Sequence, residues 1–191
     1  MPNPRDRILE FRILSLRDPD AFGEFYQTCK ADIYRFVLAR TTSEEIAEDL
    51  TSEVFLKACQ YLFEEQRAVE HLRGLLFSIA RTSVIDHFRR TTVREEVVAP
   101  DDPFFENLVD HAPSATDTVD TKLAWGTLME QLKMLRREYR EALALRFMDD
   151  LSIEEISVVL GKSTGSVRVL IHRATRALEQ AVRQKNIKPN S

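Results

Sequence analysis

The sequence predicts an all-α protein with two small helical domains. Its 191 residues include only 5 glycines and 7 prolines, too few for the many tight turns that β-sandwiches and barrels require. Apolar residues recur every three or four positions in several stretches, which is typical of amphipathic helices. These stretches form two groups, separated by a segment rich in proline and aspartate. We therefore expect a helical domain over residues 1–92, an acidic linker over residues 93–121 and a second helical domain over residues 122–191.

The first domain is expected to contain three amphipathic helices, preceded by a short leading helix. Their predicted ranges are Arg5 to Leu16, Asp20 to about Arg40, about Ser43 to Tyr61 and about Glu70 to Arg90. Asp20 is the expected N-cap of the helix that begins there. Leu75, Phe77 and Phe88 have two possible roles, in core packing or at a binding surface, and core packing is favoured for at least two of them.

The segment between the domains changes abruptly in composition. Thr91–Thr121 contains three prolines and many carboxylates without a sustained hydrophobic period, which indicates a linker. Its apolar residues Phe104, Phe105, Leu108 and Val109 are unusual in a purely solvated tether. Part of the linker is therefore a candidate for docking on a partner.

The second domain carries the most specific local signal. Ser152 and Glu155 have the spacing of a capping box, which marks the start of a helix, and Gly161 suits the left-handed C-cap that ends it. Ser163 or Thr164 can then cap a further short helix. Two short helices joined by a tight turn make a helix-turn-helix, whose second helix fits the major groove of DNA. The apolar face of this second helix is formed by Val167, Leu170, Ile171, Ala174 and Leu178.

The charge distribution supports nucleic-acid binding at this end of the chain. The formal net charge is −4, which by itself argues mildly against such binding. From Lys162 to Lys188, however, seven lysines and arginines face a single acidic residue, Glu179. Such a cluster is expected where a protein contacts phosphates. The alternative, a solvated cationic helix, is less favoured once the capping box and turn are considered.

An enzyme is not indicated by the sequence. The four histidines lie in different segments without metal-ligand spacing, a nucleophile motif or a glycine-rich loop, so no catalytic residue, metal or cofactor is expected. Cys29 and Cys59 belong to no C-x-x-C pair. The charged start and the absence of a long apolar run lead us to expect a soluble cytoplasmic protein without membrane insertion.

Two stretches together resemble a known family. Residues 45–58 and 72–90 resemble region two of bacterial sigma factors of the extracytoplasmic-function group, and residues 161–168 with 172–174 are similar to their region four. Both stretches occur in the family's order, with a linker between them. The resemblance extends from Phe22 to about Ala181 and implies a dissociable promoter-specificity subunit of RNA polymerase.

The resemblance implies three groups of functional residues. Core polymerase, through the clamp helices of its largest subunit, is expected to bind Glu48, Asp49, Leu50, Glu53, Val54 and Phe55. The minus-ten promoter element is expected to face Arg81, Thr82, Asp86, Arg89 and Arg90. The minus-thirty-five element is expected to face Lys162, Ser166, Arg168, Val169, His172, Arg173 and Arg176. In relatives, the loop matching Phe63 to His71 receives an extruded base.

The same resemblance implies further partners and leaves alternatives open. The polymerase flap and an anti-sigma factor are expected partners. The linker is either an acidic strap that imitates nucleic-acid charge in a basic channel or a solubilising tether. The acidic residues of the polymerase-binding stretch can equally be a solvated helix face. The competing functions are a helix-turn-helix regulator that binds duplex DNA as a dimer without polymerase, and a helical adaptor that binds only protein.

Overall fold

The computed structural model describes residues 4–41, 43–95 and 119–187, and every regular element in these ranges is helical. The prediction of an all-α fold is confirmed. The elements are α1 (Pro4–Leu16), α2 (Pro19–Leu38), α3 (Glu44–Cys59), the π-helix η1 (Gln60–Glu64), α4 (Leu72–Glu95), α6 (Val119–Lys133), α7 (Arg137–Phe147), α8 (Ile153–Leu160) and α9 (Thr164–Ile187). Most of the predicted linker lies outside the described residues, so its extended character and its docking role stay predictions.

The N-terminal cap of α2 differs from the prediction. Asp18, not Asp20, is the N-cap, and its Oδ1 accepts hydrogen bonds from the backbone N–H groups of Asp20 at 3.0 Å and Ala21 at 3.2 Å. Pro19 occupies the first helical position, where its missing N–H costs nothing. Arg12 of α1 donates to Asp18, and this hydrogen bond holds the pKa of the carboxyl below its ordinary value. The proline therefore moves the helix start two residues earlier than the pattern of apolar residues indicated.

The predicted capping box is confirmed. The backbone N–H of Ser152 donates to Glu155 Oε2 at 2.7 Å, and the backbone N–H of Glu155 donates to Ser152 Oγ at 3.2 Å. Gly161 ends α8 with a φ of 62°, in the left-handed region that favours glycine. Of the two candidate caps for α9, Ser163 is the one whose hydroxyl accepts from a backbone N–H, that of Ser166.

Two helices are longer than predicted. α9 has 24 residues where a short helix was expected, and Ala174 and Leu178 of its predicted apolar face pack in the second core. α4 continues five residues past Arg90, to Glu95, into the sequence assigned to the linker. α3 ends at Cys59, and the chain then widens into the π-helix η1.

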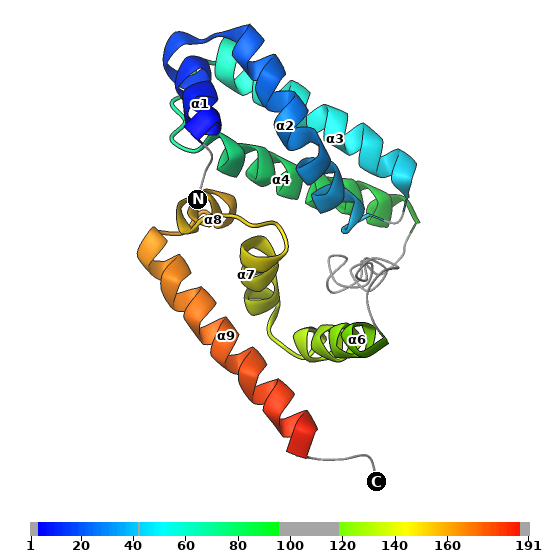
Figure 1. Ribbon diagram of the computed structural model, residues 1–191. Helices are drawn as coiled ribbons and strands as arrows, with labels where there is room; N and C mark the ends of the chain where they lie inside the picture. Colours follow the sequence, from blue (N-terminus) through cyan, green and yellow to red (C-terminus); the bar gives the residue numbers. More distant parts are fainter. Residues whose placement is uncertain (1–3, 42, 96–118, 188–191) are drawn as a thin grey trace.

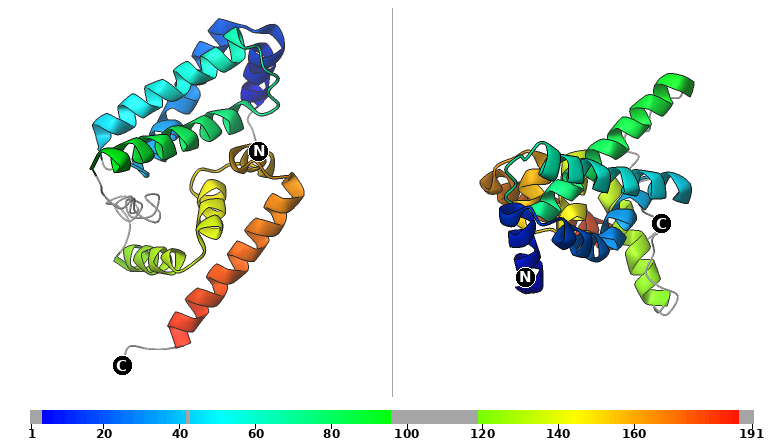
Figure 2. Two further views of the ribbon diagram at one scale, coloured as in Figure 1. Left: turned by 180° about the vertical axis from the view of Figure 1, so that it is seen from behind. Right: turned by 90° about the horizontal axis from the view of Figure 1, so that it is seen from above.

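The helices form two layers, with α1 to α4 in one and α6 to α9 in the other (Figure 1). α8 lies against α4, and the view from behind shows the same arrangement (Figure 2). The larger hydrophobic core joins both layers: Phe36 and Phe77 of the first belong to the same buried cluster as Leu145, Leu151 and Ile156 of the second. A smaller cluster around Met129 and Leu132 connects α6, α7 and α9. The sequence did not predict this continuous core.

Gly74 allows the two layers to approach closely. A Cβ atom at this position would lie 3.1 Å from Glu155 Cα and 3.2 Å from Glu155 O and Val158 Cβ. The backbones of α4 and α8 are therefore too close for a larger side chain at this point.

Candidate nucleic-acid and polymerase interfaces

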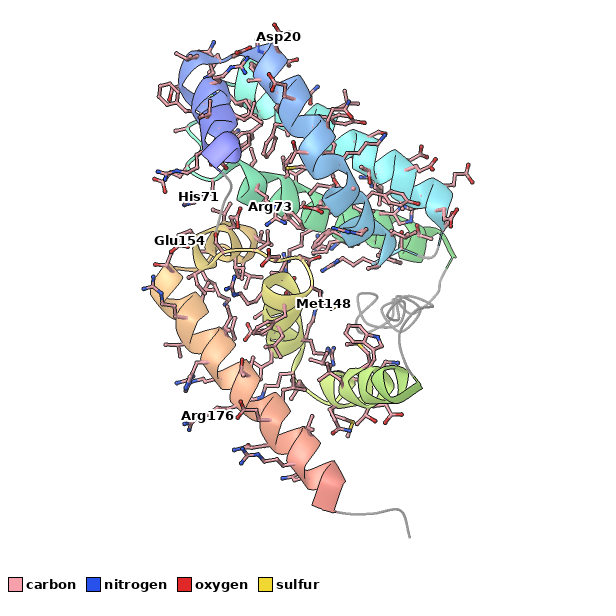
Figure 3. The ribbon with its side chains drawn as sticks, viewed as in Figure 1. Asp20, His71, Arg73, Met148, Glu154 and Arg176 are labelled. Carbon is pink, nitrogen blue, oxygen red and sulfur yellow. The ribbon has the colours of Figure 1, made fainter. Side chains whose placement is uncertain are left out.

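The helix-turn-helix presents a cationic face. Val167 and Ala174 of α9 are fully buried, which fixes the rotation of the helix about its axis. All seven residues predicted for the minus-thirty-five element are exposed, six of them on α9 and Lys162 in the turn before it: Lys162, Ser166, Arg168, Val169, His172, Arg173 and Arg176. Arg176 projects from the side of α9 opposite α7 (Figure 3). The geometry thus offers one continuous surface for DNA phosphates and base edges.

A groove of about 510 Å³ extends this surface beyond the predicted residues. Lys162, Ser166 and Arg173 line one side, and Arg136 and Tyr139 line the other, at the start of α7. Arg136 and Tyr139 were not predicted from the sequence as site residues. The consecutive arginines at positions 136 and 137 were the available signal.

Two carboxylates lie beside cations of this surface. Glu154 Oε1 of α8 is 3.7 Å from the Arg168 guanidinium, and Glu138 Oε1 of α7 is 3.7 Å from Lys162 Nζ. All four side chains are at least 41% exposed, so each ion pair is weak in water. Both cations can therefore exchange their carboxylate for a phosphate or a base edge at little cost.

The residues predicted for the minus-ten element all lie on α4. Thr82, Asp86 and Arg89 follow at intervals of four and three residues and share one face of the helix. Thr82, Arg89 and Arg90 are exposed, whereas Arg81 and Asp86 are half-buried. Arg81 donates through Nε to Glu141 of α7. In this arrangement of the layers, Arg81 is bound to a carboxylate of the second layer.

Arg73, at the N-terminal end of α4, also holds this helix against the second layer. Its guanidinium donates to Asp150 O at 3.0 Å, to Asp149 O at 2.9 Å and to Asp32 Oδ2 at 3.2 Å. It lies at the boundary of the two layers (Figure 3). Burial raises the pKa of Asp149, and the positive charges of Arg40 and Arg73 oppose this rise.

The six residues predicted to bind core polymerase separate into two sets. Glu48 and Asp49 are exposed and Glu53 is half-buried, with its Oε1 2.6 Å from Lys57 Nζ. The other three, Leu50, Val54 and Phe55, are at most 7% exposed. The expectation that these three contact a partner directly has to be corrected, because their side chains fill the core of the first layer.

The apolar side chain that α3 does expose was missed. Leu56 is 67% exposed and lies one helical turn from Ser52 and Glu53. The available signal was its spacing, because Leu56 lies two residues from Val54 and therefore outside the buried stripe of α3.

Other kinds of site have no support in the part of the chain that the structure describes. No group of three or more histidine, cysteine, aspartate or glutamate side chains there is placed to hold a metal ion. Leu75 and Phe77 are buried and Phe88 packs against the core, in agreement with the structural role favoured for them. Within the same ranges, no helix has the length and apolar character needed to span a membrane.

Comparison with known proteins agrees with this geometry. Residues 25–94 match the family described as Sigma-70 region 2, and residues 126–178 match Sigma-70, region 4. The ECF RNA polymerase sigma factor SigM of Bacillus subtilis is 31% identical over 159 residues, which cover 82% of this chain and 91% of SigM. The ECF RNA polymerase sigma factor BldN of Streptomyces coelicolor is 33% identical over 161 residues, which cover 84% of this chain and 60% of BldN.

Two solved structures share the fold. The sigma factor RpoE of Bartonella quintana, in complex with the anti-sigma factor NepR, has a TM-score of 0.58 at 18% identity and covers 85% of this chain and 96% of its own. CnrH, in complex with the cytosolic domain of CnrY, has a TM-score of 0.58 at 20% identity and covers 94% of this chain and 98% of its own. At these identities the two structures show that the helical fold is shared. The chain belongs to the ECF group of the sigma-70 family of sigma factors.

Proposed function

We propose that this protein binds core RNA polymerase and directs it to promoters that carry minus-ten and minus-thirty-five elements. The observation that carries the proposal is the exposed cationic face of α9 in a chain whose α3 and α4 expose separate acidic and cationic surfaces. A regulator that only binds duplex DNA needs the cationic face of α9 but does not need the surfaces of α3 and α4.

α9 is proposed to read the minus-thirty-five element in duplex DNA. Arg168, Arg173 and Arg176 supply contacts to base edges and phosphates, and the small Ser166 permits close approach to the backbone. Arg136 and Lys162, which both line the groove next to α9, are proposed to contact phosphates, with Lys162 leaving its exposed ion pair with Glu138.

α4 is proposed to hold the minus-ten element as the strands separate. Arg89 and Arg90 contact phosphates, and Thr82 and Asp86 offer polar groups on the same face of the helix. The loop that precedes α4, Phe63 to His71, is proposed to receive a base extruded from the opened strand. Capture of unstacked bases, worth about 1–3 kcal/mol for each stacked base, offsets the unpairing of a few base pairs.

α3 is proposed to dock on the clamp helices of the polymerase's largest subunit. Glu48, Asp49 and Glu53 form an acidic ridge that suits an arginine-rich partner, and Leu56 adds an apolar contact beside it. The second domain is proposed to contact the flap, and an anti-sigma factor is proposed to cover the polymerase-binding surfaces. The protein acts in the cytoplasm and has no catalytic role of its own.

Transcription with purified core polymerase tests the proposal. Adding the protein should direct RNA synthesis from defined start sites, and Glu48→Lys combined with Asp49→Lys should abolish both this synthesis and co-elution with core polymerase. Lys30→Glu, an exposed charge change on α2, serves as the control and should leave both unchanged. Binding of the protein to duplex DNA as a dimer, without co-elution with polymerase, would instead establish the helix-turn-helix regulator.

A further inference from the structure

Arg17 joins the N-terminal helix to the loop that enters α4. It lies between α1 and α2 with a φ of 53°, a left-handed conformation that is uncommon for a residue other than glycine. Its Nη1 donates to Leu62 O at 2.9 Å, and its Nη2 donates to Gln66 O and Arg67 O, both at 3.3 Å. One guanidinium thus binds three carbonyl groups in and after η1, where a helix end leaves carbonyls without partners.

The segment held by Arg17 carries a stacked pair of side chains. The Arg67 guanidinium lies over the Tyr61 ring at 4.9 Å from its centroid, and Arg67 Nε is 2.7 Å from Glu65 Oε2. The Arg67 side chain nevertheless stays 60% exposed. A planar guanidinium that rests on an aromatic ring and is exposed to solvent is a surface on which an unstacked base can lie.

Arg17 and two backbone hydrogen bonds, from Glu65 to Gln60 O and from Arg67 to Tyr61 O, hold the backbone of this segment. Gln66 also has a positive φ, 51°, and the backbone N–H of Arg67 reaches Tyr61 O at 3.3 Å. Residues 64–68 are all exposed, so little burial fixes their course. The bonds from Arg17 to Gln66 O and Arg67 O therefore help to fix where the Arg67 side chain is presented.

We propose that the Arg67–Tyr61 stack binds an unpaired base of the opened promoter strand and that Arg17 is the residue that positions this stack. The proposal rests on the function proposed above and assigns the capture of the base to particular side chains. Arg17 acts through the backbone and does not touch the DNA, whereas Arg67 provides the contact surface.

The test uses the full-length protein bound to core polymerase and a fork-junction DNA with a single-stranded minus-ten region. Arg67→Ala should weaken binding by about 5- to 150-fold, as expected for the loss of one stacked base. Arg17→Ala should weaken binding within the same range, and the double variant should bind no more weakly than the weaker single variant. Arg17→Lys, which keeps one donor group, should restore part of the affinity.

Two controls distinguish positioning from general destabilisation. Arg12→Ala removes the ion pairs of α1 with Asp18 and Glu24 without touching the loop, and it should leave fork-junction binding unchanged. A set of fork-junction DNAs with an abasic site at each single-stranded position in turn should include one on which wild type and the Arg17→Ala and Arg67→Ala variants bind equally.

The outcomes separate this inference from the proposed function. An Arg17→Ala variant that binds like wild type, or one whose loss is the same on every abasic DNA, would overturn the inference. The inference would also be overturned if the losses of binding from Arg17→Ala and Arg67→Ala added up in the double variant. If wild type itself binds the fork junction no better than fully duplex DNA, the proposed function fails at this site.

Discussion

The Arg40 guanidinium and the Asp149 carboxylate form an ion pair across 109 residues of sequence, with Nη2 3.2 Å from Oδ2. Both side chains are nearly buried, at 7% and 12% exposed. Arg40 also donates to Phe36 O at 2.7 Å and lies over the Phe36 ring. The pair joins the end of α2 to the turn before α8, and with Arg73 and Gly74 it holds the two layers together.

Removing Arg40 should therefore destabilise the protein strongly. Arg40→Ala leaves the Asp149 carboxylate buried without its main partner, and we expect the free energy of unfolding to fall by about 3–5 kcal/mol. Urea denaturation followed by circular dichroism measures the change. Arg35→Ala, which removes a 71% exposed side chain from its ion pair with Asp32, should cost under about 1 kcal/mol. Equal losses in the two variants would contradict the structural role of the Arg40–Asp149 pair.

Filling the space at Gly74 should separate the layers. Gly74→Leu places side-chain atoms where the Glu155 backbone lies, so we expect an increased radius of gyration in small-angle X-ray scattering with helical content retained. Gly23 lies in α2 with no atom within 4 Å of an added Cβ, and Gly23→Ala should stabilise the protein by about 0.5–1 kcal/mol. An unchanged radius of gyration in the Gly74→Leu variant would show that α4 and α8 are not packed as described.

Breaking the Arg81–Glu141 pair should release Arg81 for DNA. Glu141→Gln removes the competing charge, and binding of the protein to single-stranded DNA should strengthen by about 1.5- to 5-fold, as expected for a partly exposed ion pair. Fluorescence anisotropy at several salt concentrations measures this gain. The gain should be absent when Arg81→Ala is already present. A gain that persists in the double variant would mean that Arg81 is not the residue released.

The Arg12–Asp18 contact predicts a pH dependence in acid. The pKa of Asp18 is lower in the folded protein than its ordinary value of 3.8, so its charge stabilises the fold above that pH. This contribution is lost as the pH falls through the folded-state pKa. Asn keeps the capping oxygen but cannot ionise. The difference in unfolding free energy between wild type and Asp18→Asn should thus be greatest above pH 3.8 and should shrink in stronger acid. A difference that does not change with pH would refute the assignment.

Base contacts by α9 can be distinguished from phosphate contacts. If Arg168 makes a bidentate contact with a base, Arg168→Ala should cost about 1–3 kcal/mol at one promoter position and relax the preference there. Binding to a panel of duplexes, each with one substituted base pair, measures this effect. A uniform loss across the panel would instead identify Arg168 as a phosphate contact.

Local features of the fold could be predicted from the sequence, and contacts between distant segments could not. The capping box at Ser152 and the left-handed Gly161 depend on neighbours within a few residues, so their sequence signals are complete. The cation-bearing face of α9 also followed from spacing alone. The buried positions of Leu50, Val54 and Phe55 did not, because an amphipathic stripe does not reveal whether a core or a partner covers it.

Several of the missed features involve partners far along the chain. Gly74 carries no local signal of its approach to Glu155, and the three carbonyl partners of Arg17 lie 45 to 50 residues away. Arg136 was overlooked because its significance depends on the groove that it forms with α9. Pairing between distant segments depends on the packing of the whole molecule, and a single sequence does not contain that information in readable form.

The central claim is that one chain contacts two promoter elements at once when it is bound to polymerase. Footprinting of a promoter with and without core polymerase tests it most directly. We expect protection of both elements, with permanganate-reactive thymines at the minus-ten element, only when the protein and core polymerase are present together. Protection of a single duplex site by the protein alone, unchanged by added polymerase and without reactive thymines, would contradict the account.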